Sequence, residues 1–237
     1  MAVQARPGDQ TAMIAKHFFL LAAAVGLAGC GNTPPAPDWK MTAHSATERF
    51  TSAYLTGNSR VEDADFRRAR EALASTGQAS MVLRAELTRC ATRVAALVFE
   101  PCTGFDQLAQ DASPADRAYA AYLAGRATAA DAALLPEQHR AAASAASAGN
   151  DGAAATAVQA IADPLARLVA SGVLMRAGKA TPQTLRDAVD TASNQGWRRP
   201  LMAWLGVQVM RAQQAGDTQE AQRLQRRIDL AAGQPKT

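Results

Sequence analysis

Histidines are common in catalytic and zinc-binding sites, and this sequence contains only His17, His44 and His139. Three widely separated histidines are too few for a zinc site built from several of them, and they offer little to a nucleophile–histidine–acid triad. The sequence also has no GxSxG nucleophile motif, no phosphate-binding loop and no HExxH metalloprotease motif. We therefore expect no metal and no cofactor.

Acidic residues are the remaining candidates for catalysis, because a carboxyl group can act as a general acid. Glu71, Glu86 and Glu100 are candidates by residue type. Glu86 falls within an amphipathic stretch and is expected to be a solvated acid on a helix surface. Glu100 directly precedes Pro101, a position typical of an exposed group at a helix end. Neither Glu86 nor Glu100 lies in a recognisable family motif.

The amino-terminal segment has the features of an export signal. Lys16 and His17 precede an apolar run over residues 18–27, which is too short to cross a bilayer as a mature helix and suits a signal peptide. The run ends in Leu27-Ala28-Gly29-Cys30, which resembles the lipobox of bacterial lipoproteins. The other interpretation is an uncleaved helix that contains a cysteine by chance.

The lipobox resemblance implies a specific processing event. Residues 1–29 would be removed as the signal peptide, and the thiol of Cys30 would carry a diacylglyceryl group. Met1 and Met13 are both compatible with the start of such a signal. The membrane is therefore an expected partner through the lipid on Cys30, and several acyl chains on one cysteine give stable anchoring.

A proline-rich stretch follows Cys30. Residues 31–37 read Gly-Asn-Thr-Pro-Pro-Ala-Pro, a composition that excludes a regular helix and favours an extended tether. We assign residues 30–41 to the acylated cysteine and this tether. In enterobacterial lipoproteins an aspartate directly after the acylated cysteine favours the inner membrane, and Gly31 occupies that position here. The resemblance therefore implies the periplasmic face of the outer membrane, with the inner membrane as the alternative.

The composition of the remaining region, residues 42–233, predicts an all-α fold. Alanine accounts for 57 of the 237 residues and aromatic residues for only 5%, so a β-sandwich or β-barrel is disfavoured. Glycines and prolines divide the region into about nine to ten short helices, which we expect to pair as antiparallel hairpins. The expected helices are 42–56, 60–76, 80–99, 113–124, 128–148 with a break near Pro136, 152–162, 164–177, 182–195, 200–215 and 218–232.

Capping signals mark several of these helix starts. In a capping box, the side chain of the N-cap residue accepts a hydrogen bond from the backbone N–H three residues later. The side chain of that later residue accepts one from the backbone N–H of the N-cap residue. Ser59 with Glu62 predicts one such box, and Ser113 with Asp116 predicts another.

The arrangement of the helices has two interpretations. Ala53-Tyr54-Leu55 and Ala121-Tyr122-Leu123 lie 68 residues apart, twice the ~34-residue tetratricopeptide period, so the region weakly resembles helical-repeat envelope lipoproteins. The same signals suit an irregular helical bundle. Residues 141–155 lack large side chains and are close to low complexity, which predicts a joint between two halves of the domain.

If Cys30 is acylated, Cys90 and Cys102 are the two remaining cysteines. Two thiols in an oxidising periplasm normally pair. Cys90 lies on the apolar face of the helix expected over 80–99, and Pro101 ends that helix so that the chain can turn back. We expect a structural disulfide. An intermolecular or redox-active pair and two unpaired buried thiols are the alternatives.

One segment combines tryptophan with arginine, which are common anchors of protein interfaces. The candidate partner surface comprises Trp197, Arg198, Arg199 and Trp204. Core packing is the alternative for the tryptophans. Arginine clusters at 67–70 and 223–227 suit anionic lipid head groups, lipopolysaccharide or an acidic partner, or simple exposure on helices. The net charge of +4 is too small to favour nucleic acid, so no nucleic-acid partner is expected.

The leading hypothesis is a membrane-anchored, non-enzymatic periplasmic lipoprotein that binds or scaffolds another envelope protein. Helix-pair proteins commonly present grooves to such partners. A peptidoglycan-remodelling enzyme or its regulator, with Glu86 or Glu100 as the acid, is one alternative. A structural envelope lipoprotein without a stable partner is another.

Overall fold

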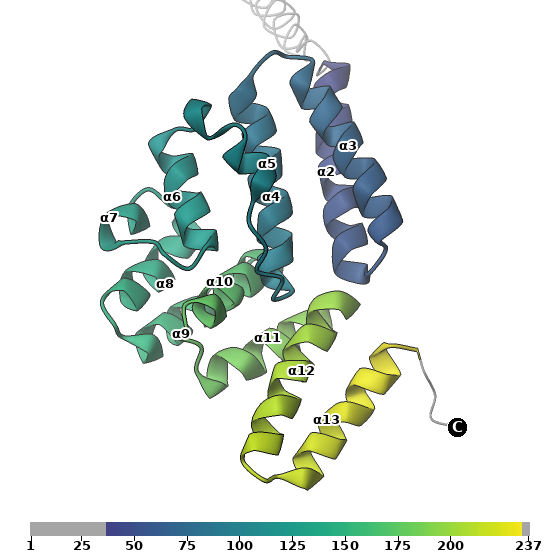
Figure 1. Ribbon diagram of the computed structural model, residues 1–237, viewed down its shortest axis with the longest axis vertical. Helices are drawn as coiled ribbons and strands as arrows, with labels where there is room; N and C mark the ends of the chain where they lie inside the picture. Colours follow the sequence, from purple (N-terminus) through teal and green to yellow (C-terminus); the bar gives the residue numbers. More distant parts are fainter. Residues whose placement is uncertain (1–36, 234–237) are drawn as a thin grey trace, which may run out of the picture. The chain divides into compact units, whose positions relative to one another are not determined.

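A computed structural model describes residues 37–233, and within this range the chain forms helices and no strands (Figure 1). The all-α prediction is confirmed. The α-helices are α2 (Asp38–Thr56), α3 (Ser59–Ala74), α4 (Ala79–Ala95), α5 (Thr103–Asp106), α6 (Pro114–Leu123), α7 (Ala129–Ala132), α8 (Glu137–Ser147), α9 (Asp151–Gln159), α10 (Pro164–Arg176), α11 (Pro182–Asn194), α12 (Arg198–Gln214) and α13 (Thr218–Ala231), and the 3₁₀ helix η1 (Ala109–Asp111) precedes α6. The signal peptide expected over 1–29 and the lipidation site Cys30 lie outside the described residues. Among the described helices, none is long and apolar enough to cross a bilayer.

The first described helix begins earlier than the sequence predicts. Helix α2 starts at Asp38, so residues 38–41, which we assigned to the tether, are helical. Pro37 stands directly before this helix, where its missing N–H removes no helical hydrogen bond. The carboxylate of Asp38 lies in the first turn, where it interacts favourably with the helix dipole.

The helix expected over 80–99 ends earlier, at Ala95. Leu97 has a φ of 60°, in the left-handed region. The N–H of Leu97 donates to the carbonyl of Val94, and the N–H of Val98 donates to the carbonyl of Arg93. This is the Schellman pattern of helix termination, with leucine where glycine is usual. The chain then turns back through α5 and η1, two short helices that the sequence did not predict.

One predicted capping box is confirmed and the other is wrong. Ser113 and Asp116 form the expected box at the start of α6. Helix α3, however, is capped by Asn58, whose side chain accepts from the N–H of Val61. Asparagine caps as well as serine and here stands one residue earlier. Glu62 is therefore free to turn inward, where its carboxylate is buried.

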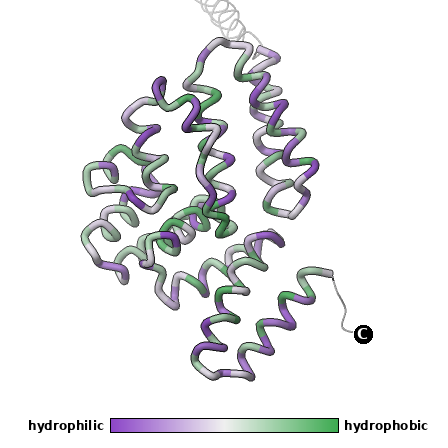
Figure 2. Tube along the Cα trace, in the orientation of Figure 1, coloured by the Kyte–Doolittle hydropathy of each residue, from purple (hydrophilic) through white to green (hydrophobic). Residues whose placement is uncertain are grey.

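Neighbouring helices pack as hairpins, notably α2 with α3, α8 with α9 and α12 with α13. Contacts between helices far apart in sequence also occur, since α4 packs against α10 and α12 packs against α2. These long-range contacts are typical of an irregular bundle rather than of a strict nearest-neighbour repeat array. Figure 2 shows hydrophobic colour along α10 and more hydrophilic colour along α3 and α13.

The alanine-rich residues 141–155 do not divide the domain. Residues 141–147 form the end of α8, 148–150 form a turn, and 151–155 begin α9, and the two helices pack on each other and on α10. All described residues from Asp38 onward lie in one compact unit, so the predicted joint is absent from the described part of the chain. Alanine permits close helix approach, and this allows a tight core without large side chains. The cluster here comprises Ala142, Ala154, Val158, Ile161, Ala166, Ala170 and Leu174.

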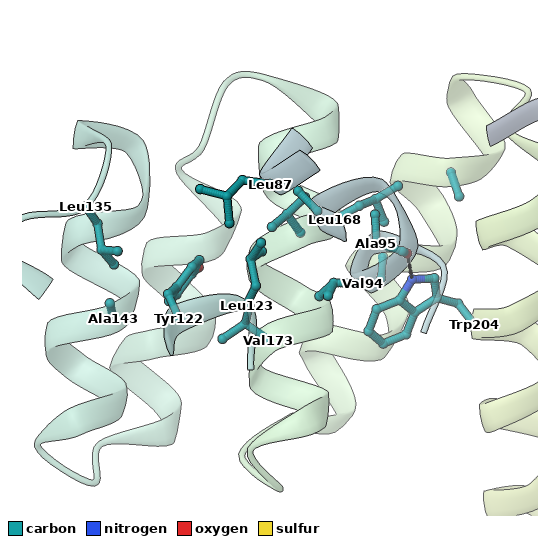
Figure 3. Packing of buried hydrophobic residues seen from close by; sticks show 14 of the residues in the cluster. Leu87, Val94, Ala95, Tyr122, Leu123, Leu135, Ala143, Leu168, Val173 and Trp204 are labelled. Atoms are coloured by element: carbon teal, nitrogen blue, oxygen red, sulfur yellow. Dashed lines mark hydrogen bonds between the residues drawn. The ribbon is translucent and has the colours of Figure 1, made fainter. Parts of the chain in front are cut away.

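The carboxyl end of α4 is held by two other helices (Figure 3). Gly172 of α10 lies so close to α4 that a Cβ atom there would overlap the carbonyl oxygen of Val94. Trp204 of α12 is fully buried, and its indole N–H donates to the carbonyl of Ala95 at 3.0 Å. The last carbonyl groups of α4 therefore fix the positions of both α10 and α12.

We expect Gly172→Ala to lower the free energy of unfolding by about 2 kcal/mol or more, because the methyl group would overlap a backbone oxygen. Gly206→Ala in α12 is the matched control. A Cβ atom at Gly206 meets nothing within 4 Å, so alanine should stabilise the protein by about 0.5–1 kcal/mol. Urea unfolding followed by circular dichroism measures both changes. Equal changes in the free energy of unfolding for the two variants would contradict the close approach of α10 to α4 at Gly172.

Candidate functional site

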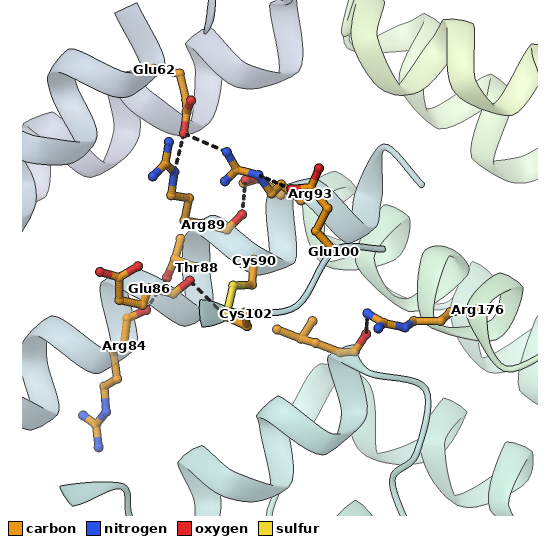
Figure 4. Close-up of a disulfide and its surroundings, with 12 residues drawn as sticks. Glu62, Arg84, Glu86, Thr88, Arg89, Cys90, Arg93, Glu100, Cys102 and Arg176 are labelled. Atoms are coloured by element: carbon orange, nitrogen blue, oxygen red, sulfur yellow. Dashed lines mark hydrogen bonds and ion pairs between the residues drawn. A yellow bond between two sulfur atoms is a disulfide. The ribbon is translucent and has the colours of Figure 1, made fainter. Parts of the chain in front are cut away.

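The two remaining cysteines form the predicted disulfide (Figure 4). Cys90 of α4 is bonded to Cys102, the residue directly before α5, with their Cα atoms 5.9 Å apart. The bond holds the segment after Pro101 against α4. Two unpaired thiols, one of the alternatives, do not occur at these positions.

The predicted partner surface is mostly an internal contact. For Trp204 the prediction is wrong, because the side chain is fully buried. Trp197 packs against the cluster formed by Tyr54, Leu55 and Ala96. Both tryptophans turn inward because they contact residues on other helices. The local sequence does not reveal these contacts.

The neighbouring arginines differ from each other. Arg199 donates to the carbonyl of Tyr54 at 2.7 Å and to the hydroxyl of Ser59 at 2.8 Å, and its guanidinium lies 4.4 Å from the centre of the Tyr54 ring. Arg199 therefore joins α12 to the hairpin formed by α2 and α3. Arg198 alone among the four predicted residues is exposed.

The candidate acids do not form a catalytic pair. Glu86 was expected to be solvated, and this is wrong, because it is only 7% exposed and pairs with Arg70 at 3.0 Å. Its carboxylate lies where a Cβ atom at position 104 would stand, so any residue larger than Gly104 would require the Glu86 side chain to move. Glu71 and Glu100 are both exposed. Glu86 therefore acts as a structural ion-pair partner between α3 and α4.

His139 is a core residue. It is 2% exposed and lies among Tyr119 and Tyr122, with the Tyr122 hydroxyl 3.3 Å from its Nδ1 atom. Burial lowers the pKa of His139 to about 4, so the ring is neutral at pH 7. Burial also raises the pKa of both tyrosines. Among the described residues, no group of three or more histidine, cysteine or acidic side chains is placed to hold a metal ion.

A groove of about 520 Å³ lies between α11, α12 and α13, and we call it the terminal groove. Its apolar lining includes Leu185, Val189, Ala212 and Leu224. The charged lining consists of Arg186, Arg211, Arg223 and Arg227 together with Asp190, Asp217 and Glu220. The arginine cluster at 223–227 was visible in the sequence, but the groove itself requires three helices to meet.

The charges in the terminal groove are only partly paired. Arg223 makes two hydrogen bonds to the carboxylate of Glu220, at 2.6 and 2.7 Å. Arg186 donates instead to the side-chain amide oxygen of Gln183, and Arg211 donates to the carbonyl of Ala180. Within the described chain, neither Arg186 nor Arg211 has a carboxylate within 4.0 Å. Their guanidinium groups keep free donors for a ligand.

An exposed leucine lies on α13 beyond the lining of the terminal groove. Leu230 is 82% exposed, the largest exposed fraction among the large hydrophobic side chains of the described residues. It follows Arg227 by three residues on α13 and so lies on the same side of that helix. Apolar surface thus continues one turn beyond the charged lining.

No family model, no curated protein and no solved structure matches this chain.

Breaking the disulfide should destabilise the fold without abolishing it. For bonded residues with a separation of 12, loss of the cross-link should lower the free energy of unfolding by about 3 kcal/mol. Thermal unfolding with and without dithiothreitol measures this effect. The Cys90→Ser/Cys102→Ser variant is the control, because it should show the lower stability and no response to the reductant. If dithiothreitol left the midpoint temperature of unfolding of the native sequence unchanged, the disulfide would not be stabilising.

Proposed function

We propose that the protein is a non-enzymatic, lipid-anchored envelope lipoprotein that binds a short amphipathic segment of another envelope protein. The terminal groove carries this proposal, because it combines an apolar lining with arginine donors that have no carboxylate partner. Leu230 adds an apolar contact beside it. The matching segment would carry apolar side chains flanked by acidic ones.

The terminal groove suits a peptide segment for a physical reason. An amphipathic helix or extended segment places its apolar side chains into a groove and leaves its polar groups at the edge. The lining carries four arginines and three acids, a difference of one positive charge. The pairing of Glu220 with Arg223 leaves three arginines against Asp190 and Asp217, so one positive charge remains in excess and favours acidic residues on the partner.

The lipobox supports the anchoring part of the proposal. Eight residue steps separate Cys30 from Asp38, the first helical residue. A fully extended chain covers at most ~3.3–3.6 Å per residue, so acylation at Cys30 would place the start of α2 within roughly 30 Å of the bilayer. Proteins of the envelope are then the partners within reach.

Peptidoglycan cleavage has less support. A general acid must reach the bond that it protonates. Glu86 is instead buried and paired with Arg70, and Glu100 is exposed beside Arg93 at 4.0 Å. No observation on the described residues favours this alternative.

Photocrosslinking in cells tests the terminal groove. A photoreactive phenylalanine analogue at Gln208, which lines the groove, should yield a discrete adduct with an envelope protein. Arg227→Glu should reduce this adduct by at least about tenfold, because it places a repelling charge against an acidic segment. Arg226→Glu is the matched control, because Arg226 is exposed on the same helix outside the groove lining, and it should leave the adduct unchanged. The same adduct from Gln222, or none from Gln208, would refute the proposal.

Fractionation tests the anchor. Metabolic labelling with a palmitate analogue should mark the native protein, which should sediment with outer membranes. Cys30→Ser removes the acylated thiol, so labelling should disappear and the protein should move to the soluble or inner-membrane precursor fraction. Cys90→Ser/Cys102→Ser is the control and should keep the label. Unchanged outer-membrane fractionation of Cys30→Ser would exclude anchoring through this residue.

A further inference from the structure

A second hollow, which we call the disulfide pocket, lies beside the Cys90–Cys102 bond and has a volume of about 310 Å³. Figure 4 shows the disulfide together with Arg93, Glu100 and Arg176, which also line the pocket. The disulfide, Val94, Phe105 and Leu123 give it an apolar lining. Helices α4, α5, α6 and α10 all contribute residues to it. It shares no lining residue with the terminal groove.

Charged side chains line the same pocket with an excess of arginine. The lining contains two acids, Glu100 and Asp106, and an excess of two positive charges from four arginines, Arg93, Arg117, Arg126 and Arg176. Arg93 lies 4.0 Å from Glu100 and 3.9 Å from Glu62. In the described part of the chain, the other three arginines have no carboxylate within 4.0 Å.

Two of these arginines are held in position by backbone oxygens. Arg176 is partly buried, donates to the carbonyl of Leu123 at 3.2 Å and lies 5.5 Å from the centre of the Phe99 ring. Arg117 donates to the carbonyl of Ala109 at 3.2 Å. A guanidinium has five N–H donors, so each bond leaves most donors unused while it restricts the side chain. Such pre-positioning lowers the entropic cost of binding an anion.

We propose that the disulfide pocket binds a small organic carboxylate. The planar guanidinium groups match the two oxygens of a carboxylate, and the apolar lining would accommodate a compact aliphatic or aromatic group. The volume lies at the lower end of the range of small-molecule pockets, which limits the size of that group. The carboxylate belongs either to a free acid or to the end of a peptide chain, and the two share this chemistry. This site does not depend on the proposed function of the terminal groove.

Three matched probes separate the roles of charge and apolar surface. N-acetyl-leucine carries both groups, N-acetyl-leucinamide lacks the charge, and acetate lacks the apolar part. Titration calorimetry on the full-length protein in detergent should show binding of N-acetyl-leucine, with the amide and acetate each at least about tenfold weaker. Higher salt should weaken N-acetyl-leucine binding because the contact is ionic. A leucine-terminated peptide that binds more tightly than N-acetyl-leucine would identify a chain end as the source, whereas equal or weaker binding would identify a free acid.

Substitutions locate the binding site. Arg117→Gln/Arg126→Gln should weaken N-acetyl-leucine binding by at least about tenfold. Arg67→Gln/Arg68→Gln is the matched control. These two arginines are exposed, as Arg117 and Arg126 are, but they lie on α3 outside the pocket lining, so their loss should leave binding unchanged. Ala121→Phe, which fills the pocket from α6, should also abolish binding. Thermal unfolding confirms that each variant is folded.

Several results would overturn the proposal. These are no binding of N-acetyl-leucine, equal binding of the amide or of acetate, and equal losses from the two double-arginine variants. Retained binding in folded Ala121→Phe would also place the ligand elsewhere. None of these results depends on crosslinking at the terminal groove, so the two proposals fail separately.

Discussion

The crossing of α4 and α10 is the constraint on which the rest of the structure depends. Gly172 lets the backbone of α10 lie closer to the carbonyl of Val94 than a residue with a Cβ atom would permit. One residue later, the carbonyl of Ala95 accepts the buried indole N–H of Trp204. The chain must then leave α4 through Leu97, whose left-handed backbone is costly for leucine and persists only because its surroundings are fixed. From that exit the chain reaches Cys102 and returns to α4 through the disulfide.

The low content of large hydrophobic side chains is offset in different ways in different parts of the fold. Around α8, α9 and α10, alanines bring helices close together, so that small side chains fill the core. Between α3 and α4, an ion pair and a cation–π contact supplement the apolar packing. Arg89 donates to the buried Glu62 at 2.6 Å, and its guanidinium lies 4.2 Å from the centre of the Phe66 ring. Removing one partner of this buried pair would leave an uncompensated charge.

Local sequence signals predicted most helices and the disulfide, because helix periodicity, capping residues and Pro101 act within a few residues of their position. They could not predict which side chains meet across long sequence distances. Trp204 turns inward because Ala95, 109 residues earlier, offers a carbonyl, and Glu86 is buried because Arg70 and Gly104 lie around it. The terminal groove and the disulfide pocket likewise form only where separate helices meet. The sequence displayed their arginines but not the surfaces that those arginines line.

The surroundings of each arginine separate structural from ligand-binding roles. Arg89 and Arg70 donate to carboxylates, so their charges are compensated within the protein. Arg176, Arg117 and Arg211 donate instead to backbone carbonyls, which position the side chain without neutralising its charge. Such an arginine keeps its charge available for an anion, and for the partly buried Arg176 the surrounding protein atoms screen that charge less than water does. The disulfide pocket and the terminal groove both contain arginines of this second kind. This feature, more than the number of arginines, distinguishes the two hollows as binding sites.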